Sequence, residues 1–278
     1  MAAVPLYPYK ERLPAVIYWP YRAIRTLGVA FCFAAFWGGA VLIGWLWLPL
    51  LALWPGSRET KIRRVLRTVR RAFKLFHGTM RVLRLYHRRS PFRLLRPGGL
   101  PTDTPVVLVA NHPTLCDTTS ICSLFPNIVA VASPAYANHR MVRRLVRSCG
   151  FVPIGLHMMK DCQDRLAMGF DVLIFPEGTR SPVGGLHPFH RGAFEVAARA
   201  QVPIVLVKLT CVPSALSKRL PIWKIPDTTA VLSIEPFDVI DPTSMPSREL
   251  CRVVEQRYRE LLGYSPVPEQ VSESSRTA

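Results

Sequence analysis

Acidic residues are scarce in this sequence, with 18 Asp and Glu against 36 Lys and Arg, and the formal net charge at pH 7 is +18. Such a charge is unusual for an ordinary soluble enzyme and indicates an anionic partner, such as a nucleic acid or a membrane surface. The charge is unevenly spread, because fourteen of the basic residues lie between Arg58 and Arg96, where Glu59 is the single acid. That segment must account for the basicity.

The sequence also lacks cysteine pairs in a CxxC spacing. Its seven cysteines are an odd number, which argues against a disulfide framework, and the missing pairs argue against a structural zinc site. We expect reduced thiols that pack as small core residues. Apolar residues make up 49% of the 278 positions, which excludes disorder for most of the chain and allows one sizeable core.

Charge is absent altogether between Thr26 and Ser57, and residues 27–54 read LGVAFCFAAFWGGAVLIGWLWLPLLALW. About 20 apolar residues cross a hydrocarbon core, whereas the apolar region of a signal peptide is only about 7–15 residues long. A buried core helix would not remain uncharged for so long. We therefore expect residues 1–57 to be membrane-embedded, either as one span or as a re-entrant hairpin interrupted at Gly38-Gly39, Gly44 or Pro49.

Residues 58–97 are expected to form a basic amphipathic juxtamembrane helix. Apolar residues recur at steps of three and four from Ile62 to Leu83, and arginines fill the other face. Because the segment directly follows the membrane segment, contact with anionic lipid headgroups explains it better than nucleic acid, which we do not expect as a partner. The alternative is a solvated helix packed on the downstream domain. The positive-inside rule places that domain at the cytoplasmic face of the membrane.

The Pro- and Gly-rich stretch at 96–105 is expected to be a linker, after which short apolar runs alternate with helical patterns. This alternation predicts an α/β domain over 98–242, with a mixed, largely parallel sheet flanked by helices. Residues 243–278 are expected to form a final helix, over 247–263, and a disordered tail. The predicted strands are 106–110, 128–132, 171–175, 204–209 and 230–234, and the predicted helices are 118–124, 140–148, 163–168 and 193–200.

Polar side chains follow two of these strands. The stretch NHPTLCD, residues 111–117, comes after the strand at 106–110, at a carboxyl end where ligand clefts open in α/β sheets. A turn that brings Asp117 onto one imidazole nitrogen of His112 leaves the other nitrogen free to take a proton from a hydroxyl. By themselves these residues fit equally a helix N-cap carboxylate and a turn histidine bonded to the backbone.

The second strand end reads DVLIFPEGTRS, residues 171–181. Gly178 allows close approach of the backbone, Thr179 and Ser181 offer hydroxyls, and Arg180 offers a planar fork suited to phosphate. A surface turn with a solvated Glu177 and Arg180 is the alternative interpretation. One strand end able to deprotonate and another able to hold an anion predict a single cleft.

Together, the His-four-residues-Asp spacing and Phe-Pro-Glu-Gly-Thr-Arg-Ser resemble the glycerolipid acyltransferase family, specifically the lysophosphatidic acid acyltransferases. The resemblance covers about residues 98–242, and the stretches at 150–154 and 202–205 are similar to two further blocks of that family. It implies direct acyl transfer from an acyl-CoA or acyl-carrier-protein thioester to a lyso-lipid hydroxyl, with no covalent acyl-enzyme, no metal and no cofactor. The residues implied are His112 as general base, Asp117 as its orienting partner, and Glu177, Gly178, Thr179 and Arg180 as the acceptor site.

The sequence departs from the family pattern by lacking cations. Leu156 stands where the family usually has an arginine that helps to hold the acceptor phosphate, and Ser133 stands where a lysine is common. We therefore expect poor use of lysophosphatidic acid compared with an acceptor of lower charge, such as an amino-acid lipid, a glycolipid or a hydroxylated pigment lipid. Lys208, Arg191 or a basic residue of 58–97 are the alternative sources of the missing charge.

Two other functions compete with this interpretation. A non-catalytic membrane protein that binds lipid would not need the base, and a hydrolase that passes the thioester to water would release acid without any lyso-lipid. Cys116 is expected to be a core residue, because nothing else in the sequence supports an activated thiolate. The stretch SKRLPIWKIP at 217–226 is either an interfacial contact or a plain surface loop.

Overall fold

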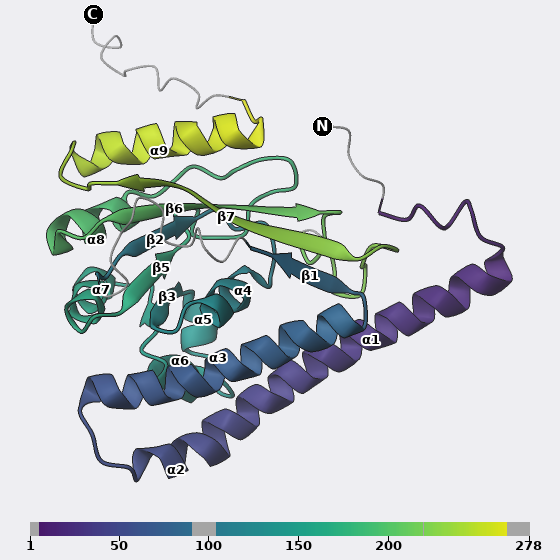
Figure 1. Cartoon of the computed structure of the whole chain (residues 1–278), viewed down its shortest axis with the longest axis horizontal. Helices are drawn as coiled ribbons and strands as arrows, with labels where there is room; N and C mark the ends of the chain where they lie inside the picture. Colours follow the sequence, from purple (N-terminus) through teal and green to yellow (C-terminus); the bar gives the residue numbers. More distant parts are fainter. Residues whose placement is uncertain (1–5, 91–103, 219, 266–278) are drawn as a thin grey trace, which may run out of the picture.

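The computed structural model of the chain describes residues 6–90, 104–218 and 220–265, and its centre is a seven-stranded sheet with helices on both faces (Figure 1). Only the pair β6–β7 is antiparallel among the paired strands of the described residues. The predicted α/β fold with a mixed, largely parallel sheet is confirmed. The strands, in the spatial order β1-β7-β6-β2-β5-β3-β4, are β1 (Tyr86–Arg89), β7 (Ala230–Ile240), β6 (Ile204–Val212), β2 (Val107–Ala110), β5 (Asp171–Ile174), β3 (Ile128–Ala132) and β4 (Val152–Pro153).

Five helices lie at or near predicted positions, namely α4 (Asp117–Leu124), α6 (Arg143–Ser148), α7 (Met158–Ala167), α8 (Gly192–Ala200) and α9 (Ser247–Leu262). Helix α7 begins five residues before the predicted one, and the four-residue α5 (Pro134–Ala137) was not predicted. The strands that sequence analysis did not predict, β1 and β4, lie at the two edges of the sheet. Both are short, at four and two residues, and β1 reads Tyr-His-Arg-Arg, so neither carries the apolar pattern that marks a strand.

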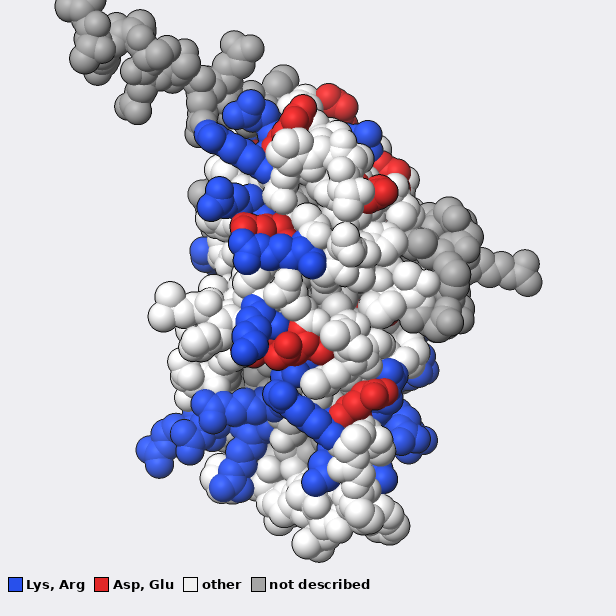
Figure 2. All heavy atoms as spheres, turned by 90° about the vertical axis from the view of Figure 1, so that its left-hand side faces the viewer, with Lys and Arg blue, Asp and Glu red and all other residues white. Residues whose placement is uncertain are grey.

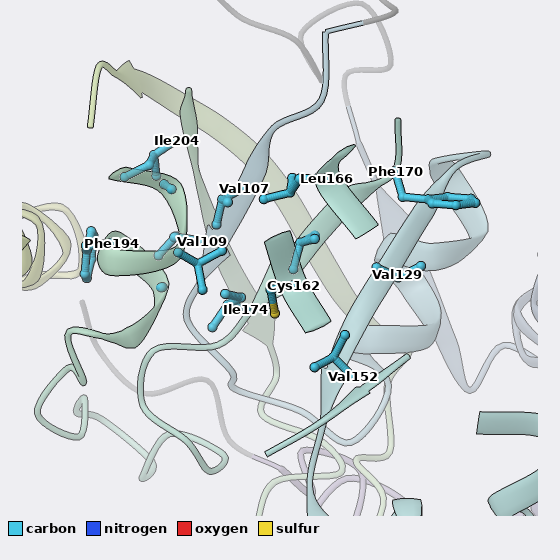
Figure 3. Packing of buried hydrophobic residues seen from close by; sticks show 14 of the residues in the cluster. Val107, Val109, Val129, Val152, Cys162, Leu166, Phe170, Ile174, Phe194 and Ile204 are labelled. Atoms are coloured by element: carbon cyan, nitrogen blue, oxygen red, sulfur yellow. The ribbon is translucent and has the colours of Figure 1, made fainter. Parts of the chain in front are cut away.

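Strand β2 is fully buried, and its side chains alternate between the two faces of the sheet. Val107 and Val109 point into a cluster with α7 and α8, in which Leu166 and Phe194 are buried (Figure 3). Leu108 and Ala110 belong to the cluster on the opposite face, with residues of α1, α3 and α4. Each fully buried aliphatic side chain contributes about 1.5–3 kcal/mol, so the central strands are held from both sides.

The C-terminal helix α9 is part of the same core. The buried Tyr258 hydroxyl lies between β2 and β6, 2.8 Å from the carbonyl oxygen of Val109 and 3.0 Å from the backbone nitrogen of Val207. The structure therefore attaches residues 247–262 to the α/β domain that sequence analysis ends at 242. The predicted disordered tail, from 266 on, and nearly all of the predicted linker at 96–105 lie outside the described residues.

The apolar N-terminal segment is one continuous helical run. It consists of α1 (Ala15–Leu42), the π-helical turn η1 (Ile43–Trp47) and α2 (Leu48–Ala52), and within the described chain it is the one segment long and apolar enough to cross a membrane. Gly38 and Gly39 remain helical, and Pro49 lies in the first turn of α2, where its missing N–H is tolerated. A hairpin within 27–54 is therefore wrong for this structure.

The basic segment forms α3 (Arg58–Val82), which returns alongside α1 (Figure 1). Ser57 caps its first turn by accepting a hydrogen bond from the backbone N–H of Thr60 at 3.2 Å. Its apolar stripe, which includes Val65 and Val69, is buried in the core of the α/β domain. The helix ends at Val82 and not near residue 97, because the chain turns there into the edge strand β1.

The long helical run is fixed to the α/β domain near both of its ends. Arg25 in α1 is only 7% exposed, and its guanidinium donates to the carbonyl oxygens of Arg84, Pro226 and Thr228 at 3.0–3.1 Å. In η1, the Trp45 indole N–H donates to the carbonyl oxygen of Met141 at 3.3 Å. The run therefore lies along the domain and does not project away from it.

Candidate active site

The two polar strand ends meet because β2 and β5 are parallel neighbours, with Val109 paired with Ile174. Their carboxyl ends lie at the same edge of the sheet, so the turns that follow are side by side. A backbone hydrogen bond from Ser181 N–H to the carbonyl oxygen of His112, at 2.7 Å, joins the two turns directly. The structure thus brings residues 69 positions apart in the chain into one site.

The imidazole of His112 is held by Asp117, with 2.8 Å between Nδ1 and Oδ2. The carboxylate is 0% exposed and also accepts hydrogen bonds from the backbone N–H of Thr114, at 2.7 Å, and from its hydroxyl. The His112 side chain is 18% exposed, and no described residue bonds its Nε2. A carboxylate on Nδ1 favours the tautomer in which Nε2 accepts a proton, which is the arrangement that a general base requires.

Two further contacts fix the orientation of this turn. The His112 ring stacks on Phe175, with ring centroids 4.1 Å apart and planes within 18°. The side chain of Asn111 bonds both backbone groups of Leu209 in β6, donating at 2.8 Å and accepting at 2.7 Å. The imidazole is therefore positioned by β2, β5 and β6 together, which limits the rotamers it can adopt.

Glu177 is turned into the protein. It is 3% exposed, and its carboxylate accepts hydrogen bonds from the backbone N–H groups of His112, at 3.0 Å, and His187, at 2.9 Å, and from the hydroxyl of Ser181. Burial raises the pKa of Glu177 above its ordinary value, although these hydrogen bonds oppose the shift. The described contacts of Glu177 are thus with the protein, and they connect the turn that carries His112 to the turn that carries Arg180.

The remaining predicted acceptor residues form the outer part of the second turn. Gly178 has a φ of +66°, a left-handed conformation that explains a glycine here. Arg180 donates to the carbonyl oxygen of Leu216 at 3.1 Å, and Thr179 is bonded by Lys218, with 2.9 Å between Nζ and Oγ1. Both partners belong to the loop that follows β6. Sequence analysis did not connect this loop with the site.

Two residues contribute to the site that sequence analysis did not point to. Thr114 holds the Asp117 carboxylate, and Lys218 contacts the Thr179 hydroxyl. Ser181, which the sequence offered as a hydroxyl, holds the Glu177 carboxylate. For Thr114 a signal was present, because Thr-x-x-Asp at 114–117 is the spacing of a capping box at a helix start. For Lys218 there was none, since its contact depends on where β6 lies in the sheet.

Two of the three alternative sources of the missing positive charge have carboxylate neighbours of their own. Lys208 forms an ion pair of 2.9 Å with Glu235, and Arg191 lies 3.8 Å from Glu195 on α8. Leu156 itself is 99% exposed. These positions give no reason to assign either Lys208 or Arg191 to an acceptor phosphate.

The thiols are core residues at this site and elsewhere. Cys116 is 2% exposed, and burial raises the pKa of its thiol well above the ordinary value, so it is a poor nucleophile at neutral pH. None of the described cysteines forms a disulfide, and the described residues contain no cluster of three or more His, Cys, Asp or Glu that could hold a metal ion.

The chain is similar in sequence to known acyltransferases. Residues 96–210 match the family model of the acyltransferase domain. A chloroplastic 1-acyl-sn-glycerol-3-phosphate acyltransferase of Brassica napus is 33% identical over 119 residues, which are 40% of this chain and 35% of that protein. The human 1-acyl-sn-glycerol-3-phosphate acyltransferase beta is 25% identical over 225 residues, 73% of this chain and 71% of that protein. The chain spans about a third of the length of the plant relatives it matches.

The fold has a solved counterpart as well. The crystal structure of the 1-acyl-sn-glycerophosphate (LPA) acyltransferase PlsC from Thermotoga maritima superposes with a TM-score of 0.65, at 21% identity. The match covers 87% of this chain and 95% of that chain. The two chains therefore share a fold over most of their length.

Proposed function

The chain belongs to the lysophosphatidic acid acyltransferase-like family, and on that premise we propose that it transfers a fatty acyl group to a free hydroxyl of a lysophosphatidic acid-like lipid. The proposed donor is a thioester, acyl-CoA or acyl-carrier-protein. The observation that carries the proposal is the 2.8 Å contact between His112 Nδ1 and a fully buried Asp117, with Nε2 left available.

In the proposed reaction, Nε2 of His112 takes the proton of the acceptor hydroxyl as its oxygen attacks the thioester carbonyl. Asp117 stabilises the imidazolium that forms and keeps the ring in the required tautomer. The tetrahedral intermediate then collapses with cleavage of the C–S bond, and the leaving thiolate takes the proton from the His112 imidazolium. An ester and a free thiol are formed, and His112 is neutral again. The protein's own part is a base and its orientation, so the proposal needs neither a metal nor a covalent acyl-enzyme.

Membrane association supports a lipid acceptor. The helical run of residues 15–52 exposes large apolar side chains along its whole length, from Val16 at 79% to Leu50 at 55%. Because this run contacts the α/β domain near both ends, we propose that it embeds lengthwise in one side of the bilayer and does not cross it. A helix that lies in the interface would keep the site at the membrane surface, where a lyso-lipid is found.

Basic side chains border this apolar surface. Figure 2 shows Lys and Arg gathered toward the lower part of the molecule, at the level of α2, α3 and α6, above an uncharged tip. Exposed residues there include Arg143 and Arg147 on α6 and Arg67 on α3. Attraction of anionic headgroups, on the order of 1 kcal/mol per basic residue, would hold the domain against the bilayer. We propose that this bilayer face is cytoplasmic, as the charge distribution predicts.

The substitution His112→Ala tests the proposed reaction. Loss of a general base costs roughly 10²–10⁴-fold in rate, and Asp117→Asn should do similar damage through the wrong tautomer. Purified protein is assayed for ester formation with acyl-CoA and lysophosphatidic acid, with unfolding temperature as a check on folding. Thioester consumption that is undiminished when lyso-lipid is omitted would instead identify a hydrolase. Full ester formation by His112→Ala contradicts the proposal.

A further inference from the structure

The loop that follows β6, residues 213–218, contacts both turns of the site, the one after β2 that carries His112 and the one after β5 that carries Arg180. The carbonyl oxygen of Leu216 accepts two hydrogen bonds, one from the backbone N–H of Leu115 at 3.0 Å and one from Arg180 Nη1 at 3.1 Å. Leu115 is in the turn that carries His112, and Arg180 is in the turn of the Glu-Gly-Thr-Arg sequence. A single carbonyl group therefore connects this loop to both halves of the site.

Two features of the loop cost free energy, although the Leu216 side chain also packs in the hydrophobic core. Leu216 has a φ of +55° although it is not a glycine, and it is buried. Ser217 is 2% exposed, and its buried hydroxyl has no hydrogen-bond partner among the described residues. Strained backbone and unpaired buried polar groups concentrate at functional sites, because there the geometry serves a ligand.

The loop carries a cation into the site. Lys218 is exposed, and its Nζ lies 2.9 Å from the Oγ1 atom of Thr179, the residue that precedes Arg180 in the sequence. Among the described residues no carboxylate forms an ion pair with Lys218, whereas Lys208 and Arg191 each have one close by. A lysine that is held at a turn by a neutral hydroxyl keeps two of its three donors and its full charge for another partner.

Building on the proposed function, we propose that Lys218 and Arg180 together hold the phosphate of the acceptor lipid. Lys218 then supplies the second cation that Leu156 does not. A phosphate dianion is normally shared among several donors, and the Arg180 guanidinium and the Lys218 ammonium group can provide them. The two cations are linked through the same loop and turn, because Arg180 bonds Leu216 and Lys218 bonds Thr179, the residue before Arg180. Lys218 is thus a specificity residue that selects a phosphate-bearing lyso-lipid over an uncharged one, which reverses the expectation drawn from Leu156.

The test is Lys218→Gln in the full-length protein, compared with Lys218→Arg and with the control Lys224→Gln. Lys224 is exposed in the same loop region, and no described side-chain contact joins it to the site. We expect Lys218→Gln to raise KM for lysophosphatidic acid about tenfold or more, as the loss of a charged hydrogen bond implies, with kcat little changed. KM for the uncharged acceptor monoacylglycerol and KM for acyl-CoA should stay within about twofold of wild type. Lys218→Arg keeps the positive charge, so its KM for lysophosphatidic acid should be close to that of wild type.

Other outcomes overturn the proposal in distinct ways. An equal loss with lysophosphatidic acid and monoacylglycerol would mean that Lys218 acts only by supporting the turn, and a raised KM for acyl-CoA would assign it to the donor. Equilibrium binding of lysophosphatidic acid and of inorganic phosphate to wild type and Lys218→Gln, in neutral detergent, gives a readout that needs no turnover. If wild type transfers no acyl group but Lys218→Gln binds lysophosphatidic acid more weakly, the proposed reaction fails while the phosphate site stands. Unchanged binding in the variant refutes the site.

Discussion

The carboxylate of Glu177 lies behind the backbone of His112, accepting its N–H at 3.0 Å, and does not lie on the open side of the site. Through the second oxygen it also holds the backbone of His187 at 2.9 Å. The sequence resemblance implies Glu177 as an acceptor-binding residue, whereas these contacts predict a structural role. We expect Glu177 to act as a buried brace between the turn that carries His112 and the turn that carries Arg180.

This role predicts a particular kinetic signature for Glu177→Gln. The amide keeps the size of the carboxylate but loses one acceptor and the charge that strengthens the hydrogen bonds from His112 and His187. We expect kcat to fall by about tenfold or more, in line with 1.5–3 kcal/mol for a charged hydrogen bond, while KM for the acceptor changes little. Steady-state kinetics with varied lyso-lipid decides this. A rise in acceptor KM at constant kcat would restore Glu177 to direct substrate contact.

Cys116 should be dispensable for catalysis. It is buried beside Asp117, and the raised pKa of its thiol keeps it protonated at neutral pH. Cys116→Ser should therefore retain at least about a third of wild-type kcat, with some loss of stability from placing a hydroxyl in an apolar position. Mass spectrometry of protein mixed with acyl-CoA serves as the control. An acyl adduct on Cys116, together with an inactive serine variant, would require a two-step mechanism.

Electrostatic attraction to the membrane can be tested on the intact chain. Removing residues 1–57 would expose the core, because Val29 and Cys32 of α1 are buried in it. The double substitution of Arg67 and Arg71 by Gln on exposed positions of α3 is therefore the better change, and it should weaken binding to anionic vesicles by about 1 kcal/mol per residue.

The matched control for this experiment is the double substitution of Arg248 and Arg252 by Gln on α9, on the opposite side of the molecule (Figure 1). It removes the same charge but should leave vesicle binding unchanged. The difference between the two variants should shrink in 0.5 M salt, where the Debye length is only a few ångström. Equal loss from both variants would mean that net charge matters and the face does not.

The buried His77 should make the folded protein less stable in mild acid. It is buried between α3 and α4, with Nε2 3.0 Å from the hydroxyl of Thr119, and burial lowers its pKa from 6.5 to about 3, with help from Arg88. The folded state thus holds His77 neutral, while the unfolded chain takes up a proton below pH 6.5. Its contribution to stability is complete above pH 6.5 and is lost as the pH falls toward 3, at up to about 1.4 kcal/mol per pH unit.

The variant His77→Gln isolates this effect. It keeps a hydrogen-bonding side chain opposite Thr119 but cannot take up a proton, so its unfolding temperature should fall less than that of wild type between pH 7 and pH 5. Thermal unfolding in a neutral detergent at both pH values gives the comparison. Parallel losses in the two proteins would assign the acid sensitivity to other groups, such as the carboxylates.

Local pattern determined much of the site. Asp117 lies five residues from His112, so a single turn and the first residues of a helix suffice to join them, and the sequence of that turn encodes the contact. The central strands were equally predictable, because β2 and β5 carry unbroken apolar runs that only burial on both faces of a sheet explains. That these two strands end in polar turns was also visible in the residues.

Tertiary structure decided the rest, since it depends on the order of strands and on contacts between distant segments. The inward turn of Glu177 follows from the pairing of β2 with β5, and the contact of Lys218 with Thr179, 39 residues apart, follows from the placement of β6 beside β2. The edge strand β1 forms because β7 offers unpaired backbone groups to a short segment without apolar alternation. Periodicity records which face of an element is buried; it does not record which element covers that face, because many partners bury the same area with the same free energy.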